Sequence, residues 1–195
     1  MKYNLIYLLL MLLTLTSCQN GYEKIDDNWY YITFDEGAGK RENQLYAHLP
    51  TFKVLDNSDY AKDKDSVYFE GRIIKGAHSA SFRTIGNTIY SLDKKNVYIY
   101  WYKIPNADPN SFEILETPYS KDKNRIFCGN ISLKISKVEK FELLNFDGYS
   151  IMDTSVFNKR FSNLILDRFE IETIVYSDAN ALINGKRYKG IELIE

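Results

Sequence analysis

The sequence predicts an all-β protein, an array of short β-hairpin repeats of about thirty residues with single helical turns, arranged as a curved sheet or a propeller-like assembly. The main evidence is that residues 60–85, 90–115 and 119–144 align without gaps. The aligned positions are an aspartate, a β-branched residue, a phenylalanine and a final aliphatic residue: Asp63, Asp93 and Asp122; Val67, Val97 and Ile126; Phe82, Phe112 and Phe141; Ile85, Leu115 and Leu144. The composition agrees, since 16 Tyr and 11 Phe beside only 4 Pro are typical of strand-rich chains. Because no such unit buries its apolar face alone, the copies are expected to pack on one another, with the three phenylalanines at equivalent buried sites.

Each copy opens with an aromatic residue and a charged stretch, residues 60–65 in the first copy. Asp and Asn side chains bond to nearby backbone and tolerate left-handed dihedral angles, so this stretch is interpreted as a turn. A short strand follows at residues 67–69, then a hairpin connection at Glu70-Gly71 and a return strand at residues 72–74. The same order is therefore expected in the second and third copies.

The last part of the unit is clearest in the second copy. Asp108 before Pro109 is a helix-start signature, because the aspartate caps and proline suits the first helical position. One helical turn is expected there. Residues 112–115 then predict a third short strand, or an extended segment that enters the core.

Weaker copies flank these three. Residues 26–31 together with 51–55 are interpreted as a first copy with an insertion, whose polar, Gly-rich part at 37–43 predicts a mobile loop. Residues 153–157 could begin a degenerate copy, and residues 176–186 are interpreted as a final half-copy. Atypical end copies are expected where a repeat array is capped.

The N-terminus predicts export. Lys2 supplies a positive charge, and Leu5–Leu13 form an apolar run too short for a membrane-spanning helix but suited to a signal peptide. Leu15-Thr16-Ser17-Cys18 resembles the lipobox of bacterial lipoproteins. The resemblance implies cleavage before Cys18 and a membrane anchor through acyl chains on this residue, which bind a bilayer firmly when two or three are present. The alternative is an ordinary cleaved signal peptide in which Cys18 is incidental.

The chain is accordingly divided into a lipoprotein signal peptide (1–17), a short tether (18–25) and a single repeat domain (26–195). No linker splits the repeat domain. The expected localisation is the bacterial cell envelope. Gln19, where an aspartate would favour retention at the inner membrane of enteric bacteria, favours the outer membrane if the cell has two.

Two phrases of the repeat resemble a known family. They are residues 60–69 and 119–127, which read YAKDKDSVYF and YSKDKNRIF, together with residues 107–115, ADPNSFEIL. They are similar to the repeats of the DKNYY family of bacterial exported and lipid-anchored proteins. The resemblance covers residues 26–144 well and the rest faintly, and Asp65 and Lys95 depart from it where asparagine is typical. It implies a repeat fold and an exported protein, and it brings no catalytic residues.

Charge and cysteine content restrict the function further. The net charge is −1, and removal of Lys2 with the leader makes it −2, so bulk charge attracts neither nucleic acid nor an anionic lipid surface. If Cys18 is lipidated, Cys128 is the remaining thiol and no intrachain disulfide forms. Cys128 aligns with Phe69 and Ile99, which favours a small core residue over a reactive thiol.

No catalytic or metal-binding constellation stands out, and no cofactor is expected. The two histidines are interpreted as a surface residue, His48, and a turn-capping residue, His78, at the position of Asp108. The aspartate-rich turns could suggest calcium, but Lys lies between or beside their oxygens and no bidentate Glu follows, so a structural turn is favoured. A carboxylate-only enzyme such as a glycosidase remains a distant third hypothesis.

The candidate binding residues are Tyr100, Trp101 and Tyr102. They replace the hairpin tip that the sister copies build from Glu70-Gly71 and Gly129-Asn130. Large aromatic rings exposed at a tip would suit a protein partner or sugar rings, and the alternative is that Trp101 is buried against a neighbouring unit.

The leading hypothesis is therefore a non-enzymatic, lipid-anchored cell-envelope repeat protein that presents an interaction surface. Its expected partners are the membrane, through the acyl chains, and an envelope protein or glycan. Nucleic acid is not expected. The alternative is a carbohydrate-binding envelope module that uses exposed Tyr and Trp side chains.

Overall fold

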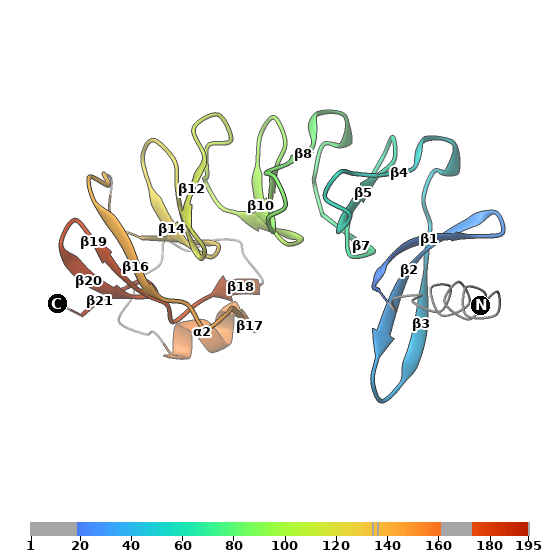
Figure 1. Cartoon of the computed structure of the whole chain (residues 1–195). Helices are drawn as coiled ribbons and strands as arrows, with labels where there is room; N and C mark the ends of the chain where they lie inside the picture. The colour runs from blue at the N-terminus through green and yellow to red at the C-terminus, as the bar shows by residue number, and fades with distance from the viewer. Residues whose placement is uncertain (1–18, 134, 136, 161–172, 195) are drawn as a thin grey trace, which may run out of the picture.

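The computed structural model describes residues 19–133, 135, 137–160 and 173–194, and over these the chain is all-β apart from one helix and two 3-10 turns. Small antiparallel sheets stand side by side in an arc (Figure 1). Three of them are repeats of one design, which we name unit 1 (residues 48–74), unit 2 (78–104) and unit 3 (108–133). The predicted repeat fold is thus confirmed, as an open curved array.

Each unit is a four-stranded antiparallel sheet with its strands in sequence order. The strands are, in unit 1, β4 (Lys53–Val54), β5 (Tyr60–Lys62), β6 (Val67–Phe69) and β7 (Arg72–Ile73); in unit 2, β8 (Arg83–Thr84), β9 (Tyr90–Leu92), β10 (Val97–Ile99) and β11 (Tyr102–Ile104); and in unit 3, β12 (Glu113–Glu116), β13 (Tyr119–Lys121), β14 (Ile126–Cys128) and β15 (Ile131–Leu133). A short turn precedes each sheet. It is a 3-10 helix in units 1 and 2, η1 (Leu49–Thr51) and η2 (Ser79–Ser81), and in unit 3 a turn closed by Ser111 N donating to Asp108 O at 3.2 Å.

The boundaries predicted for the repeat are shifted by one strand. Residues 112–115 were expected to close the second copy, but β12 pairs with β13 and therefore opens the third sheet. Likewise β8 pairs with β9 of its own sheet, with Arg83 opposite Leu92. Residues 60–62, predicted as part of a turn, form β5, and the turn is confined to residues 63–66. The backbone groups of β8 and β12 need hydrogen-bond partners, and in each case the next strand along the chain supplies them.

A fourth sheet closes the array from two separate parts of the chain. It comprises β16 (Phe141–Asn145), β19 (Asn180–Ile183), β20 (Lys186–Lys189) and β21 (Glu192–Leu193), in that order. Residues 176–186 contribute to this sheet, as the predicted half-copy required. The inserted chain holds the two-stranded sheet of β17 (Ser150–Asp153) and β18 (Thr173–Tyr176) and helix α2 (Thr154–Arg160), below the end of the arc (Figure 1).

The prediction of a degenerate copy at 153–157 is wrong, because most of these residues begin α2. Phe157 of this helix is fully buried and its ring centroid lies 5.6 Å from that of Tyr176. Phe157 therefore anchors this helix onto β18.

The N-terminal part also differs from expectation. β1 (Gly21–Ile25), β2 (Asn28–Asp35) and β3 (Gly39–Leu45) form a separate three-stranded sheet. Residues 21–25 are thus a strand rather than part of a tether, and residues 37–43, predicted as a mobile loop, mostly belong to β3. The Asp35 carboxylate fixes the β2–β3 turn by accepting the amides of Gly37 and Ala38, each at 2.9 Å.

Tyrosine hydroxyls tie each repeat to the next. Tyr60, Tyr90 and Tyr119 occupy the same position and are fully buried. Their hydroxyls donate to backbone carbonyls of the following unit: Tyr60 to Ile89 (2.8 Å), Tyr90 to Pro118 (3.1 Å), and Tyr119 to Ala179 (3.1 Å) and Gly190 (2.8 Å). The ring of each tyrosine fills the space between two units, and the hydrogen bond of its hydroxyl group fixes how the two units are oriented.

The three phenylalanines occupy equivalent places, as predicted, but not equally deep ones. Phe82 is buried, whereas Phe112 and Phe141 are only partly buried. Each ring lies beside the linking tyrosine of the preceding unit, with centroids 5.5–5.8 Å apart. The phenylalanine therefore packs across the boundary between units rather than within one unit.

Candidate interaction site

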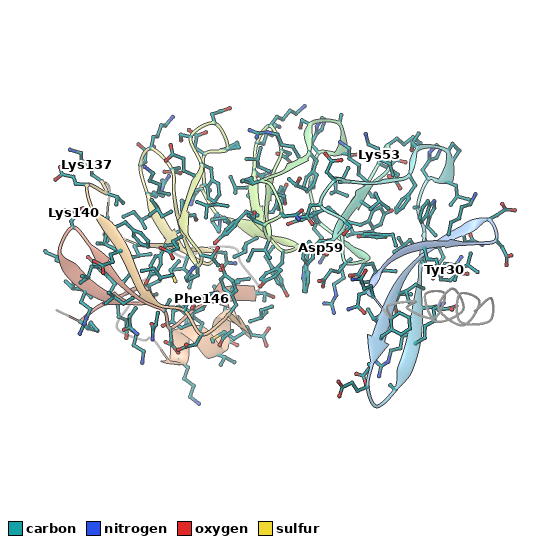
Figure 2. The ribbon with its side chains drawn as sticks, viewed as in Figure 1. Tyr30, Lys53, Asp59, Lys137, Lys140 and Phe146 are labelled. Atoms are coloured by element: carbon teal, nitrogen blue, oxygen red, sulfur yellow. The ribbon has the colours of Figure 1, made fainter. Side chains whose placement is uncertain are left out.

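Every unit has two different ends. β5 and β6 are joined at the turn that contains Asp63, while β6 and β7 are joined at the opposite end by residues 70–71. We name the end with the aspartate turns and the 3-10 turns the aspartate edge, and the end with the two-residue turns the tip edge. In Figure 2, Lys53 lies at the aspartate edge along the top of the arc, and Asp59 lies lower, towards the tip edge.

The aspartate turns are structural. In unit 1, Asp63 Oδ1 accepts the amides of Asp65 (2.8 Å) and Ser66 (2.6 Å), and Oδ2 accepts the His48 amide (2.8 Å) and the Tyr68 hydroxyl (3.1 Å). Asp93 and Asp122 repeat the three amide bonds, and Tyr98 repeats the hydroxyl bond to Asp93. Burial opposes ionisation of Asp63, but the three amides and Tyr68 outweigh it and lower its pKa. The carboxylate oxygens of Asp63, Asp93 and Asp122 thus accept protein donors, and no group of three or more metal-ligating side chains occurs in the described part of the chain.

Both histidines serve the same edge. His48 and His78 precede η1 and η2, and their amides donate to the aspartates of their own units. Their Nδ1 atoms lie 2.9 Å from Thr51 Oγ1 and 2.8 Å from Ser81 Oγ. The cap position predicted for His78 is confirmed, and His48 occupies the same position before η1, but neither imidazole caps a backbone amide; each contacts a hydroxyl of its own turn.

Cys128 is fully buried in the core between unit 3 and the fourth sheet. Burial raises the pKa of its thiol to about 12, which keeps it protonated at neutral pH. It occupies the position of Phe69 and Ile99 in register, as the alignment predicted. The side chain therefore acts as a core residue.

A flanking strand lies against the glycine in the tip of each outer unit, although Glu70 beside Gly71 stays exposed. A Cβ added at Gly71 would lie 2.6 Å from the Cβ of Tyr31, and one at Gly129 would collide with the Val175 carbonyl oxygen. Asn130 adds to the contact with Val175, since its backbone N–H donates to Val175 O at 3.0 Å and its side-chain Oδ1 accepts the Val175 N–H at 2.9 Å. Glycine is needed in both tips because another strand lies directly against the backbone.

The tip of unit 2 is built differently. Tyr100 and Trp101 form its two-residue turn, and Tyr100 has φ 55°, in the left-handed region that bulky side chains rarely adopt. Tyr100, Trp101 and Tyr102 are all partly exposed. At least one ring was expected to reach solvent, and all three do so in part. A tip that keeps large aromatic side chains on a strained backbone is a candidate for function.

These rings form a connected cluster with residues that the sequence did not single out. The Arg72 guanidinium lies 4.4 Å from the Trp101 ring centroid, a cation–π contact. Tyr149 of the inserted segment meets Tyr100 edge-on, with centroids 5.7 Å apart, and its hydroxyl lies 3.2 Å from that of Tyr90. The cluster thus joins unit 1, unit 2 and the insertion. In the sequence, only the position of Arg72 at the neighbouring tip pointed to its role, and no pattern pointed to Tyr149.

The predicted lipidation site, Cys18, lies outside the described residues. Within the part of the chain that the structure describes, no helix has the length and apolar character to cross a membrane.

A family model described as "DKNYY family" matches residues 3–102 and, in a second overlapping match, residues 90–189. Together the two matches span most of the chain, which agrees with the repeat seen in the sheets. No curated protein and no solved structure shows significant similarity to it.

Proposed function

Since the chain belongs to the DKNYY family, we propose that it is a non-enzymatic, lipid-anchored protein of the bacterial cell envelope that binds another envelope protein through the aromatic tip of unit 2. The observation that carries this proposal is the contrast between the tips. At the tips of units 1 and 3 a flanking strand lies against the glycine and the turn carries no aromatic side chain, whereas the tip of unit 2 keeps Tyr100, Trp101 and Tyr102 partly exposed.

The non-enzymatic part rests on how the candidate reactive groups are used. The imidazoles of His48 and His78 contact hydroxyls of their own turns, and Cys128 is enclosed in the core. The aspartates of the repeat accept backbone amides. Groups already engaged in holding turns are poorly placed to act as general bases or nucleophiles.

The crowding of Trp101 favours a protein partner over a sugar. A sugar stacks on an open ring face, but the Trp101 ring has Arg72 at 4.4 Å and has Phe69 and Tyr102 with centroids at 5.9 and 5.1 Å. Aromatic residues grouped with an arginine are instead the side chains that dominate protein–protein hot spots.

We expect exchange of the tip to abolish partner capture. In this variant Tyr100→Glu and Trp101→Gly install the tip of unit 1, a sequence that already forms the equivalent turn in this protein. The variant should fold normally, because Glu70 already has φ 46° in the sister tip, close to the φ 55° of Tyr100, and Gly at position 101 tolerates any φ. The measurement is quantitative affinity capture from detergent-solubilised envelopes with the wild type and the variant side by side.

Tyr46→Ala provides the matched control, since Tyr46 is 93% exposed and lies outside the tip. The wild type and the control should capture the same protein, and the tip variant should lose it at least tenfold, as expected for removing an aromatic hot spot worth about 2 kcal/mol. Equal capture by all three proteins would refute the proposed surface. Loss of glycan-array binding instead of protein capture would replace the proposal with the carbohydrate-binding alternative.

The anchor is tested separately. Labelling with a fatty-acid analogue should tag the wild type, and Cys18→Ala should remain unlabelled and accumulate as the uncleaved precursor, because the thiol is the proposed acceptor of the first lipid. The readout is in-gel detection of the label after immunoprecipitation. Equal labelling of both proteins would contradict lipidation at Cys18.

A further inference from the structure

The aspartate edge of unit 2 lacks the acids that each neighbouring unit carries there, although unit 1 shares its histidine and a basic residue at two of the positions, as His48 and Lys53. At three equivalent positions where a sister unit has an acid, unit 2 has a basic residue or histidine. Lys95 takes the place of Asp65 in unit 1, and Arg83 and His78 take the places of Glu113 and Asp108 in unit 3. The change leaves the turns intact, because in every unit a backbone amide donates to the same oxygen of the turn aspartate.

The local charge is strongly one-sided. Between Glu70 and Asp108 the chain carries six cations, and its one acid is Asp93, whose carboxylate is 1% exposed and bound by the turn. The cations are all exposed: Arg72, Lys75, Arg83, Lys94, Lys95 and Lys103. This excess is hidden in the whole chain, whose net charge is only −1.

The sister units pair several of their cations with acids at this edge. Lys64 Nζ lies 2.6 Å from Asp65 Oδ2, Lys123 Nζ lies 3.0 Å from Asp108 Oδ2, and Lys121 Nζ lies 3.0 Å from Glu113 Oε2. In unit 2 the position of the Lys123–Asp108 pair is taken by Lys94 Nζ and His78 Nε2, 3.3 Å apart. Among the described residues, Arg83, Lys94 and Lys95 form no ion pair. Like charges held together without counter-charges repel each other, and an anion that binds between them is stabilised by all of them.

We propose that His78, Arg83, Lys94 and Lys95 form a binding site for the charged groups, carboxylate or phosphate, of an acidic polysaccharide. Arg125 lies in the turn of unit 3 at the same edge, and Lys53 of unit 1 lies along it in Figure 2. Cations repeated from unit to unit suit a linear polymer with repeated negative charges. This edge and the aromatic tip lie at opposite ends of the strands, so the inference does not depend on the proposed function.

A polysaccharide fits better than a nucleic acid or a lipid surface. Proteins that bind single-stranded nucleic acid add exposed aromatic rings for base stacking, but the only aromatic residue of the segments 78–83 and 93–96 is Phe82, which is buried. Those segments also present no large apolar side chain that could enter a bilayer interface.

The test compares two double variants with the same change in net charge. Arg83→Glu with Lys95→Asp introduces side chains that the sister units already carry at these positions, so the turn should be preserved. Arg41→Glu with Lys24→Asp makes the same substitutions on exposed residues of the N-terminal sheet. Fluorescence anisotropy of the full-length protein in neutral detergent is measured with labelled polygalacturonate, a phosphorylated mannan and neutral dextran.

Polygalacturonate, the phosphorylated mannan or both should bind, more weakly as salt is raised, and neutral dextran should not. The unit 2 variant should lose about tenfold in affinity and the control variant less than about twofold, as expected for a local rather than a bulk charge effect. Equal loss in both variants, or no binding of either acidic polymer, would overturn the proposal. So would stronger binding to phosphatidylglycerol vesicles or to a single-stranded oligonucleotide, which would assign the edge to a lipid surface or to nucleic acid.

Discussion

Replacing Asp93 with alanine is expected to lower the free energy of unfolding by about 3–5 kcal/mol. Its carboxylate accepts four hydrogen bonds, from the amides of Lys95 (2.7 Å), Asn96 (2.8 Å) and His78 (2.9 Å) and from the Tyr98 hydroxyl (2.9 Å). Each buried donor left without an acceptor costs about 1–3 kcal/mol, and water entering the turn would recover part of that sum. Urea denaturation of wild type and variant measures the difference.

Asp65→Ala is the matched control, because Asp65 lies two residues after the equivalent Asp63 but is exposed. Its effect should stay within about 0.5 kcal/mol, the usual range for surface substitutions. An Asp93→Ala variant that unfolds within about 1 kcal/mol of wild type would show that the turn does not depend on the carboxylate.

The same comparison has a defined pH dependence. Burial opposes ionisation of Asp93, but the amides of His78, Lys95 and Asn96 and the Tyr98 hydroxyl outweigh it, so its folded pKa is lowered from 3.8. A lowered pKa contributes stability that is present above the unfolded value and lost as pH falls through the folded one. The charge-dependent part of the difference between wild type and Asp93→Ala should therefore be constant above about pH 5 and shrink below pH 4.

The repeat itself could be predicted because its signals are local and occur three times. An aspartate that accepts the amides two and three residues ahead fixes a turn wherever it occurs, so Asp63, Asp93 and Asp122 mark the same turn in each unit. The strand after each turn was also identified correctly, because Val67, Val97 and Ile126 begin β-branched, aromatic segments that are buried.

The boundaries of the units could not be predicted from the same alignment. A periodic sequence fixes the length of the repeat but not its starting point, so assigning residues 112–115 to the preceding or the following sheet required the pairing of β12 with β13. Residues 176–186 were predicted as a half-copy, but the pairing that builds the fourth sheet was beyond local signals. Its β16 and β19 are separated by the inserted chain, and they pair only because both complete the array.

The candidate site was partly predictable for a similar reason. Tyr100 and Trp101 stood out because they break the repeat at a tip, and the tip is where the structure places them. Arg72 and Tyr149 reach that tip from a neighbouring unit and from the insertion, contacts that depend on the stacking of sheets. The basic edge of unit 2 was visible in principle, since comparing charges at aligned positions reveals Lys95 opposite Asp65.

Phe82→Ala is expected to destabilise the protein more than Phe112→Ala, although the two residues are equivalent in the repeat. Phe82 is 4% exposed, and its ring lies between Tyr60 of unit 1 and Tyr98 of unit 2, with centroid distances of 5.8 and 6.3 Å. Truncating a fully buried phenylalanine costs about 3–5 kcal/mol through lost burial and the cavity left behind. Phe112 is only partly buried, so its truncation leaves a site that solvent can fill and should cost about half as much.

Parallel urea and thermal denaturation of the two variants measures this order, and tryptophan fluorescence shows whether units 1 and 2 separate. Because Trp101 contacts Phe69 of unit 1, loss of Phe82 packing should shift the Trp101 emission to the red, with Trp29→Phe in the background of both proteins to isolate it. Equal costs for the two variants would mean that the unit boundaries are packed alike. A Phe82→Ala variant as stable as wild type would mean that the hydroxyl bonds of Tyr60 and Tyr90 hold the units together without the phenylalanines, and would place the cohesion of the array in its hydrogen bonds rather than its apolar contacts.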